Sequence, residues 1–278
     1  MPELPEVEAV RQILQPQLAG RTVAAAEVCS PQIIACPDAG RFAELLRGKT
    51  IAGMDRRGKF LTIRFESGDR VVLHLRMTGQ LLVLPAGEPR EKHTHLILTL
   101  SDGNQLRYID VRRFGRFWYI PAGEADSVSG QAKLGPEPAD PALTAAYLQT
   151  RLGGGKRPIK EALLDQTVVA GIGNIYADEI LFTAGVHPGT KCCALTAPDW
   201  ERLAAQIPQI IRWGIEANRT TPEEYLRGKG KDYRDITGLR AYGRAGQPCP
   251  VCGRAMEKTT VGGRTSCYCP QCQKKQGN

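Results

Sequence analysis

The sequence predicts an α+β protein with more than one domain: a β-sandwich that follows one N-terminal helix, then a helical region, then a small cysteine-rich ribbon. Short β-rich runs separated by tight turns occupy most of the first 120 residues. Helical periodicity replaces them from about residue 141 to residue 217, and two C-x2-C pairs follow near the end. The 278 residues, 42% of them hydrophobic, suffice for two ordinary domains or one large one.

The first predicted element is a helix over residues 5–18. Pro5 suits its first turn, and the acidic Glu6 and Glu8 complement the helix dipole. Pro16 should kink or end the helix, because proline cannot donate a backbone hydrogen bond. One face of the helix is apolar and is formed by Val7, Val10, Leu14 and Leu18.

Strands are predicted next, between residues 21 and 120. Turns such as Ser67-Gly68-Asp69 and Asp102-Gly103-Asn104 separate them, and a short helix is expected near 42–46. Short strands joined by tight turns favour a β-sandwich over a parallel sheet. The individual strands are expected at 59–65, 70–75, 81–84, 95–100, 105–109 and 116–120.

The second half is predicted to be helical. Residues 121–140 are rich in Pro, Gly, Ala and Asp, as linkers often are. Residues 218–240 are polar and contain several glycines, so a mobile loop is expected there. The predicted helices span 141–151, 158–165, 174–184 and 199–217. The predicted domains are 1–130, a linker at 131–150, a helical domain at 151–240 and a ribbon at 241–278.

The positive charge is concentrated at one end of the chain. The formal charge is +8, from 37 basic and 29 acidic residues. Residues 226–278 hold 11 basic and 3 acidic residues, a difference of +8, so the remainder is neutral overall. A basic module on a neutral body favours a nucleic-acid partner over a membrane surface, since no basic amphipathic stripe accompanies it, although a solvated tail is the simpler alternative. No apolar run is long enough to cross a bilayer, and the acidic N-terminus does not resemble a secretory signal.

Four of the nine cysteines have the spacing of a zinc ribbon. Cys249, Cys252, Cys269 and Cys272 form C-x2-C-x16-C-x2-C, with Gly262-Gly263 midway, where a hairpin turn belongs. Cys267 competes for a ligand place, but only Cys269 gives the x2 spacing. One structural Zn²⁺ is therefore predicted, and the other cysteines are expected to be reduced thiols.

The N-terminus carries a candidate nucleophile. Removal of Met1 would expose Pro2 as a secondary α-amine, which titrates near neutrality and is therefore partly unprotonated. Such an amine can attack a sugar anomeric carbon to give an iminium, and the neighbouring Glu3 could supply a proton. Taken alone, these residues fit a simple helix start better.

Several motifs occur in a fixed order along the chain: MPELPEVE at the N-terminus, RRGKFL at 56–61, HLRMTG at 74–79, DVRRFG at 110–115, LLDQTVVAGIGNIYADE at 163–179, YGR at 242–244, and the ribbon. In these motifs the chain resembles the formamidopyrimidine-DNA glycosylase family, bacterial base-excision enzymes that remove 8-oxoguanine and ring-opened purines. The resemblance covers nearly the whole chain, apart from 121–155 and 218–240. It implies a catalytic N-terminal helix and a helix–two-turns–helix element for DNA binding.

The resemblance also implies roles for single residues. Pro2 is the implied nucleophile, Glu3 the acid and base, Glu6 a supporting carboxylate, and Lys59 the group that holds a phosphate near the reacting sugar. Without the resemblance, Lys59 would be read as a solvated surface lysine. The implied DNA contacts are His74, Met77, Arg112, Phe114, Lys160, Asn174, Tyr242 and Arg264.

Three of those contacts, Met77, Arg112 and Phe114, would fill the space that an extruded nucleotide leaves in the base stack. Apolar wedges offset part of the cost of unstacking, and Arg112 could bond the stranded partner base. Core packing is the usual role of Met and Phe, but Met77 and Phe114 lie in glycine-bounded turns. The Gly171–Asn174 turn could approach a phosphate, with Asn174 as the N-cap of the next helix.

The loop at 218–240 would cover the extruded base, by the same resemblance. Thr220 and Thr221 are its candidates for touching the base. Gly228 and Gly230 should make it mobile without DNA. The loop departs from the family at Pro222 and at the basic residues Lys229, Lys231 and Arg234.

The function implied is a bifunctional DNA glycosylase and AP lyase that needs no cofactor besides zinc. Its partner would be double-stranded DNA containing a damaged base, without a membrane partner, and it would act as a monomer in the bacterial cytoplasm at the nucleoid. Two alternatives stay open. One is an endonuclease VIII-like glycosylase for oxidised pyrimidines, disfavoured by Leu4 and the RRFG segment. The other is a non-catalytic zinc-ribbon DNA-binding protein, disfavoured by the intact Pro2-Glu3.

Overall fold

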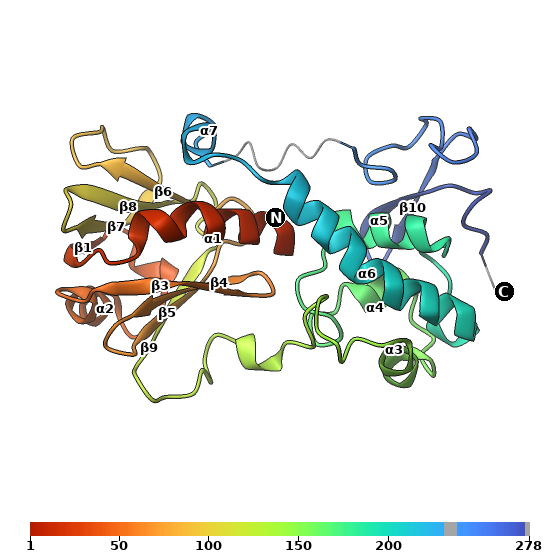
Figure 1. The fold of residues 1–278 in the computed structure, drawn as a ribbon, viewed down its shortest axis with the longest axis horizontal. Coiled ribbons are helices and arrows are strands. Elements are labelled where there is room, and N and C mark those ends of the chain that lie inside the picture. The colour runs from red at the N-terminus through yellow and green to blue at the C-terminus, as the bar shows by residue number, and fades with distance from the viewer. Residues whose placement is uncertain (231–237, 276–278) are drawn as a thin grey trace. The chain divides into compact units, whose positions relative to one another are not determined.

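The computed structural model describes residues 1–230 and 238–275, which form two compact units (Figure 1). The first unit holds residues 1–2, 6–132 and 218–230 of the described chain. The second holds residues 3–5, 133–217 and 238–275. The chain therefore changes unit within its first six residues.

Two sheets build the first unit and confirm the predicted β-sandwich. The four-stranded sheet is antiparallel and has the order β1-β7-β8-β6, from Val23–Val28, Thr94–Leu100, Asn104–Ile109 and Gln80–Pro85. The five-stranded sheet has the order β2-β9-β5-β4-β3, from Ile34–Cys36, Arg116–Ile120, Arg70–His74, Phe60–Phe65 and Ile51–Arg57. Only the short pairing of β2 with β9 is parallel in these two sheets.

Strands β1, β2 and β3 were not among the strands predicted individually. Strand β1 reads VAAAEV, and alanine and glutamate have low β propensity. Strand β2 has three residues, and β3 contains Gly53 and ends on two arginines. Cross-strand pairing therefore supplies what the local composition of these segments lacks.

Helix α1 (Leu4–Leu18) contributes its apolar face to the sandwich core. Its side chains share one buried cluster with residues of both sheets, including Leu61 and Leu98. The helix continues past Pro16 to Leu18, so Pro16 does not end it. Leu14 and Leu18 are fully buried, and this burial holds the last turn. Helix α2 (Ala39–Leu46) includes the short helix predicted near 42–46. Asp38 caps it, because its carboxylate accepts from Arg41 N–H.

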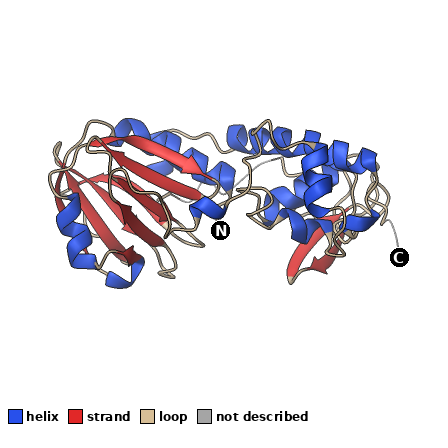
Figure 2. Cartoon of the chain, turned by 90° about the horizontal axis from the view of Figure 1, so that it is seen from below, coloured by secondary structure: helices blue, strands red, loops and turns tan. Residues whose placement is uncertain are grey.

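The second unit is mainly helical. Figure 2 shows its helices together with one β-hairpin. Residues such as Tyr176 and Trp200 form its core. Its helices are α3 (Ala145–Leu152), α4 (Ile159–Leu163), α5 (Asn174–Ala184) and α6 (Ala197–Ala217), and its hairpin pairs β10 (Glu257–Val261) with β11 (Arg264–Tyr268).

The predicted loop at 218–240 differs in the structure, because Pro222–Arg227 form helix α7. Thr221 caps it in a capping box with Glu224, and Pro222 takes the first helical position, where proline is favoured. Tyr225 enters the sandwich core and its hydroxyl donates to Leu81 O at 3.0 Å. Residues 218–230 therefore group with the first unit, whereas the sequence placed them in the helical domain.

Across residues 1–230 and 238–275, none of the helices has the length and apolar character needed to cross a bilayer.

Candidate functional site

The carboxylate of Glu3 is anchored at the start of helix α5. Glu3 is 3% exposed, and its two oxygens accept from Ile175 N–H at 2.9 Å and Tyr176 N–H at 3.3 Å. These N–H groups belong to the first turn of the helix, where backbone donors have no intrahelical partner and the dipole favours an anion. Glu3 is therefore held in a fixed position by backbone groups.

The glycine turn before α5 makes room for the N-terminal residues. A Cβ on Gly173 would lie 2.2 Å from Cδ of Glu3, and one on Gly171 would lie 2.5 Å from a Leu4 methyl carbon. Leu4 N–H also donates to Gly171 O at 3.1 Å. The turn was expected to approach a phosphate, but in the structure its glycines accommodate Glu3 and Leu4.

Asn174 is not the N-cap that the sequence predicted. Helix α5 begins at Asn174 and its N-cap is Gly173, which has no side chain to cap with. The Asn174 side chain instead donates to Thr265 O at 3.1 Å. The capping role belongs to Glu3, which is distant in sequence, so local sequence could not reveal it.

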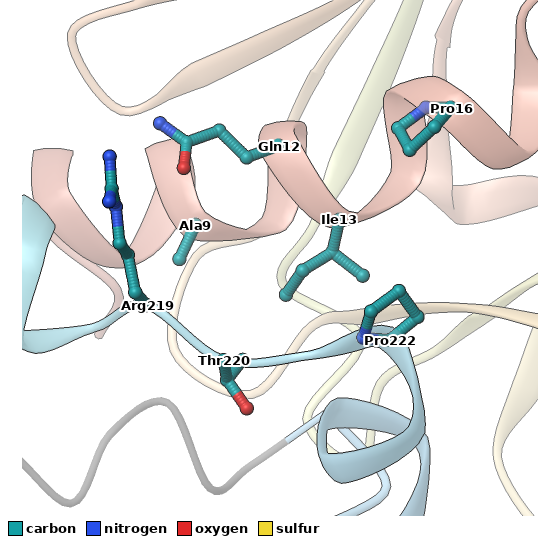
Figure 3. A pocket seen from close by; sticks show the side chains of 7 residues that line it. All are labelled: Ala9, Gln12, Ile13, Pro16, Arg219, Thr220 and Pro222. Carbon is teal, nitrogen blue, oxygen red and sulfur yellow. The ribbon is translucent and has the colours of Figure 1, made fainter.

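In the first unit, Pro2 and Glu6 lie at the N-terminal end of the sandwich helix. Pro2 is buried, and Glu6 is 2% exposed. The Asn218 side chain donates to Glu6 Oε1 at 3.3 Å and is itself 2% exposed. Residues 218–222 thereby begin beside the predicted supporting carboxylate. Arg219 and Thr220 line a pocket of about 310 Å³ together with Ala9 and Gln12 of α1. Figure 3 shows these side chains on the two sides of the pocket.

Lys59 and His74 are brought together by strand pairing. Lys59 lies in the two-residue turn between β3 and β4, and Phe60 pairs with His74 of β5. Arg76 N–H donates to His74 Nδ1 at 2.9 Å, which leaves Nε2 as the protonated nitrogen of the neutral ring. Burial, with Arg76 and Lys59 nearby, lowers the pKa of His74 to about 3. His74 can thus offer a phosphate a neutral N–H donor, while Lys59 supplies charge.

Met77, Arg112 and Phe114 are exposed. Met77 is 39% and Phe114 46% exposed, which is unusual for large apolar side chains. The Arg112 guanidinium lies 4.6 Å from the centre of the Phe114 ring. Core packing, the alternative reading of Met77 and Phe114, does not describe these positions. Asp110, the buried first residue of the DVRRFG motif, was not singled out from the sequence.

The predicted zinc ligands converge in the structure. The four sulfur atoms of Cys249, Cys252, Cys269 and Cys272 lie within 4.8 Å of one another. Two of the separations are 3.9 Å and 3.5 Å, and a tetrahedral zinc with Zn–S bonds of 2.3 Å needs about 3.8 Å. The donor set therefore fits one structural Zn²⁺. Cys267, the competing candidate, is not part of the cluster.

The ribbon hairpin presents Arg264 and is held from beneath by a buried ion pair. Gly262 and Gly263 have φ of 55° and 73°, as a tight hairpin turn requires, and Arg264 directly after them is exposed. Lys160 Nζ donates to Asp178 at 2.7 Å and to Thr265 O at 2.9 Å.

Lys160, a predicted DNA contact, has a structural partner within the chain. Its side chain is 0% exposed and is bonded to Asp178. Asp178, which the sequence did not single out, also accepts from Cys267 N–H at 3.0 Å. Lys160 of α4 and Asp178 of α5 therefore hold strand β11 against both helices. Loss of either partner would leave an unpaired buried charge, which is costly.

Two further expectations involve the residues around the ribbon and the loop. Tyr242 is partly buried, and its N–H donates to Glu179, which also accepts from Arg240 and Ala241.

Thr220 and Thr221 were candidates for touching a base. The Thr220 hydroxyl donates to the Glu224 carboxylate, and the Thr221 hydroxyl accepts from Glu224 N–H. Lys229 pairs with Glu91, whereas Lys231 and Arg234 lie outside the described residues.

Family models cover three segments of the chain. Residues 1–117 match the formamidopyrimidine-DNA glycosylase N-terminal domain, and residues 134–225 match the H2TH domain of the same family. Residues 246–275 match a zinc finger found in FPG and IleRS. The helix–two-turns–helix element and the zinc ribbon of the predicted fold are thereby confirmed.

Relatives that match nearly the whole chain carry the same family name. The formamidopyrimidine-DNA glycosylase of Geobacillus kaustophilus is 43% identical over 275 residues, 99% of this chain and 100% of the relative. That of Moorella thermoacetica is 43% identical over 93% of this chain and 94% of its own. The Lactococcus lactis Fpg, solved with abasic-site DNA, superimposes with a TM-score of 0.89 at 33% identity, covering 98% of this chain and 100% of that one. A MutM structure with DNA containing carbocyclic 8-oxo-G gives a TM-score of 0.88 at 34% identity.

Proposed function

Because this chain belongs to the formamidopyrimidine-DNA glycosylase family, we propose that it is a base-excision DNA glycosylase that removes oxidised purines and also acts as an AP lyase. The observation that carries the proposal is the anchored carboxylate of Glu3, the residue directly after Pro2, which is held by the N–H groups of Ile175 and Tyr176 at the start of α5. It would act as a monomer on damaged double-stranded DNA in the bacterial cytoplasm.

The reaction follows from the chemistry of a secondary amine. The Pro2 nitrogen attacks C1′ of the damaged nucleotide, the glycosidic bond breaks, and the base leaves with a proton from an acid such as Glu3. The C1′–O4′ bond of the sugar ring then breaks as O4′ takes a proton, and the amine nitrogen forms a double bond to C1′. The resulting iminium acidifies the C2′ proton. Its removal expels the 3′ phosphate, and a second elimination expels the 5′ phosphate. Lys59 and His74 would hold the phosphate next to the reacting sugar.

Borohydride trapping tests the proposal. The full-length protein should form a covalent adduct with abasic duplex DNA in borohydride, because an iminium is reducible, and should release 8-oxoguanine from a lesion duplex. A non-catalytic DNA-binding protein would form no adduct. Faster release of oxidised pyrimidines than of either purine lesion would instead support the endonuclease VIII alternative.

Arg112 should decide which base is tolerated opposite the lesion. Its donors match the O2 and N3 acceptors of cytosine and meet the amino donor of adenine poorly. We expect excision of 8-oxoguanine opposite cytosine to be much faster than opposite adenine, and Arg112→Ala to reduce that preference by about tenfold. Single-turnover excision rates on the two duplexes measure the ratio. Arg90→Ala, an exposed arginine paired with Glu27, is the control. An unchanged ratio in Arg112→Ala would contradict the assignment.

Arg264 at the ribbon tip should contact phosphate and carry no sequence information. Arg264→Ala should weaken binding to all duplexes similarly and reduce the slope of log K against log salt by about one. Binding titrations at several salt concentrations measure the slope. Arg254→Ala, an exposed arginine elsewhere in the ribbon, is the matched control. A loss confined to lesion DNA would exclude this role for Arg264.

A further inference from the structure

A buried carboxylate lies beneath the exposed turns of Met77 and Phe114. Asp110 is 0% exposed and follows strand β8. Its Oδ1 accepts from the Thr78 hydroxyl and from Arg112 N–H at 3.1 Å. Its Oδ2 accepts from Gly115 N–H at 3.0 Å and the Tyr108 hydroxyl at 2.9 Å. An ionised carboxylate has about four acceptor positions, and all four are used here.

The donors come from both exposed turns. Thr78 follows Met77 in one turn, and Gly115 follows Phe114 in the other. Arg112 is itself a donor through its backbone, and it also donates to Thr78 Oγ1 at 3.3 Å. Arg112 is therefore itself bonded to the Asp110 carboxylate, and Met77 and Phe114 each precede a residue that is bonded to it.

Two glycines allow this arrangement. A Cβ on Gly115 would lie 1.7 Å from the Tyr108 hydroxyl oxygen, and a Cβ on Gly79 would lie 2.6 Å from it. The fully buried Tyr108 can thus reach Asp110 only because both turns have glycine at the contact. The carboxylate, the phenol and the two glycines form one packed unit.

The backbone of both turns needs such support. Arg76 has φ of 57° and Arg113 has φ of 54°, in the left-handed region that residues with a side chain rarely adopt. Such conformations persist where the surrounding structure holds them, and they cluster at functional sites. Burial opposes ionisation of Asp110, but the bonds from Thr78, Gly115 and Tyr108 outweigh it and lower its pKa, so the group is an anion at neutral pH.

We propose that Asp110 is a positioning residue for base-stack insertion: its carboxylate locks the turns at 75–79 and 110–115 into the arrangement that presents Met77, Arg112 and Phe114 to DNA. This inference rests on the proposed function, which makes those three side chains the ones that enter the stack. Asp110 touches no DNA itself and acts through the turns.

Asp110→Asn is the sharpest variant. The amide has nearly the same size, but its NH2 group faces a backbone N–H whichever way the amide is turned. The Thr78 or Tyr108 hydroxyl can turn to accept from the NH2 group, whereas a backbone N–H can only donate. The variant must therefore give up the bond from Arg112 N–H or the bond from Gly115 N–H. We expect 8-oxoguanine excision opposite cytosine to fall by roughly tenfold or more, and the cytosine-to-adenine rate ratio to fall toward one.

Two variants of Thr78 provide a second test. Thr78→Val keeps the shape but removes the hydroxyl donor, and should lower the ratio in the same direction. Thr78→Ser keeps the hydroxyl and should restore the wild-type ratio. If Asp110→Asn fails to fold, this pair decides the question, because the hydroxyl is only partly buried and its loss removes one bond to the carboxylate.

Asp69→Asn is the matched control. Asp69 is another buried carboxylate of the sandwich; it accepts from Lys49, from Ser67 and from Ala122 N–H at 3.0 Å. It precedes strand β5, whereas the Met77 turn follows that strand, and its partners Lys49, Ser67 and Ala122 lie outside both turns. Asp69→Asn should lower the melting temperature and leave the cytosine-to-adenine ratio unchanged.

Insertion is read directly with 2-aminopurine next to an abasic site in duplex DNA, because its fluorescence rises on unstacking. Wild type and Asp69→Asn should give the rise, and Asp110→Asn and Thr78→Val should reduce it. A folded Asp110→Asn with wild-type fluorescence and ratio would overturn the inference, as would an equal change in Asp69→Asn. If wild type excises no 8-oxoguanine, the proposed function fails, and the fluorescence comparison still judges Asp110.

Discussion

Pro2→Gly should lose nearly all borohydride trapping on abasic DNA. Glycine also exposes an α-amine after removal of Met1, but the amine is primary and lacks the ring that fixes its direction toward C1′. Misplacing a reacting atom by about 1 Å can cost about a hundredfold in rate, and we expect a loss of at least that size in base excision. Gel separation of the reduced adduct measures trapping, and single-turnover assays measure excision.

Two variants separate the roles at the N-terminus. Pro16→Ala removes a proline from helix α1, which begins at Leu4 after Pro2, and leaves the amine intact, so it should trap like wild type. Glu3→Gln should impair base excision more than cleavage of a ready-made abasic site, because only the first step expels a base that needs a proton. An undiminished adduct in Pro2→Gly would refute Pro2 as the nucleophile.

The position of Glu3 at the start of α5 shows what the sequence could and could not predict. The MPELPEVE motif marks Glu3 as important, and the glycines at 171 and 173 mark a special turn. Their connection is invisible in sequence, since the two segments are about 170 residues apart and meet only through packing. Backbone N–H groups at a helix start donate to a carboxylate as readily as to a phosphate, so the chemistry of the turn alone could not identify Glu3 as its partner.

Lys160 and the 218–230 segment show how burial changes what composition suggests. A lysine in a DNA-binding element looks like a phosphate contact, but burial against Asp178 makes Lys160 a structural cation. Residues 218–230 look like a loop by composition, yet Thr221, Pro222 and Glu224 carry the signature of a helix start. That signature was present in the sequence. The burial of Tyr225 was not, because it depends on strand β6 far upstream.

Cys249→Ser should cost the protein most of its DNA affinity through loss of the ribbon. Among residues 1–230 and 238–275, the buried cluster around the metal site consists of Phe182, Ala241, Cys249, Met256 and Cys269, and two of these five are predicted ligands. A unit with so little apolar surface depends on the metal for folding, and structural zinc contributes on the order of 10 kcal/mol. Loss of zinc therefore removes the surface that presents Arg264. We expect affinity for duplex DNA to fall by about a hundredfold or more at physiological salt.

The measurement pairs zinc content with DNA binding. Zinc bound per chain should fall from about one toward zero in Cys249→Ser or after strong chelation, and binding should fall with it. Cys267→Ser is the matched control, since it makes the same chemical change on the ribbon at a cysteine outside the ligand cluster. It should keep its zinc and most of its affinity. The sandwich unit should stay folded throughout, because its core shares no residue with the ribbon cluster. Unchanged DNA binding by a chain verified to lack zinc would show that the ribbon neither needs the metal to fold nor carries the contacts assigned to it.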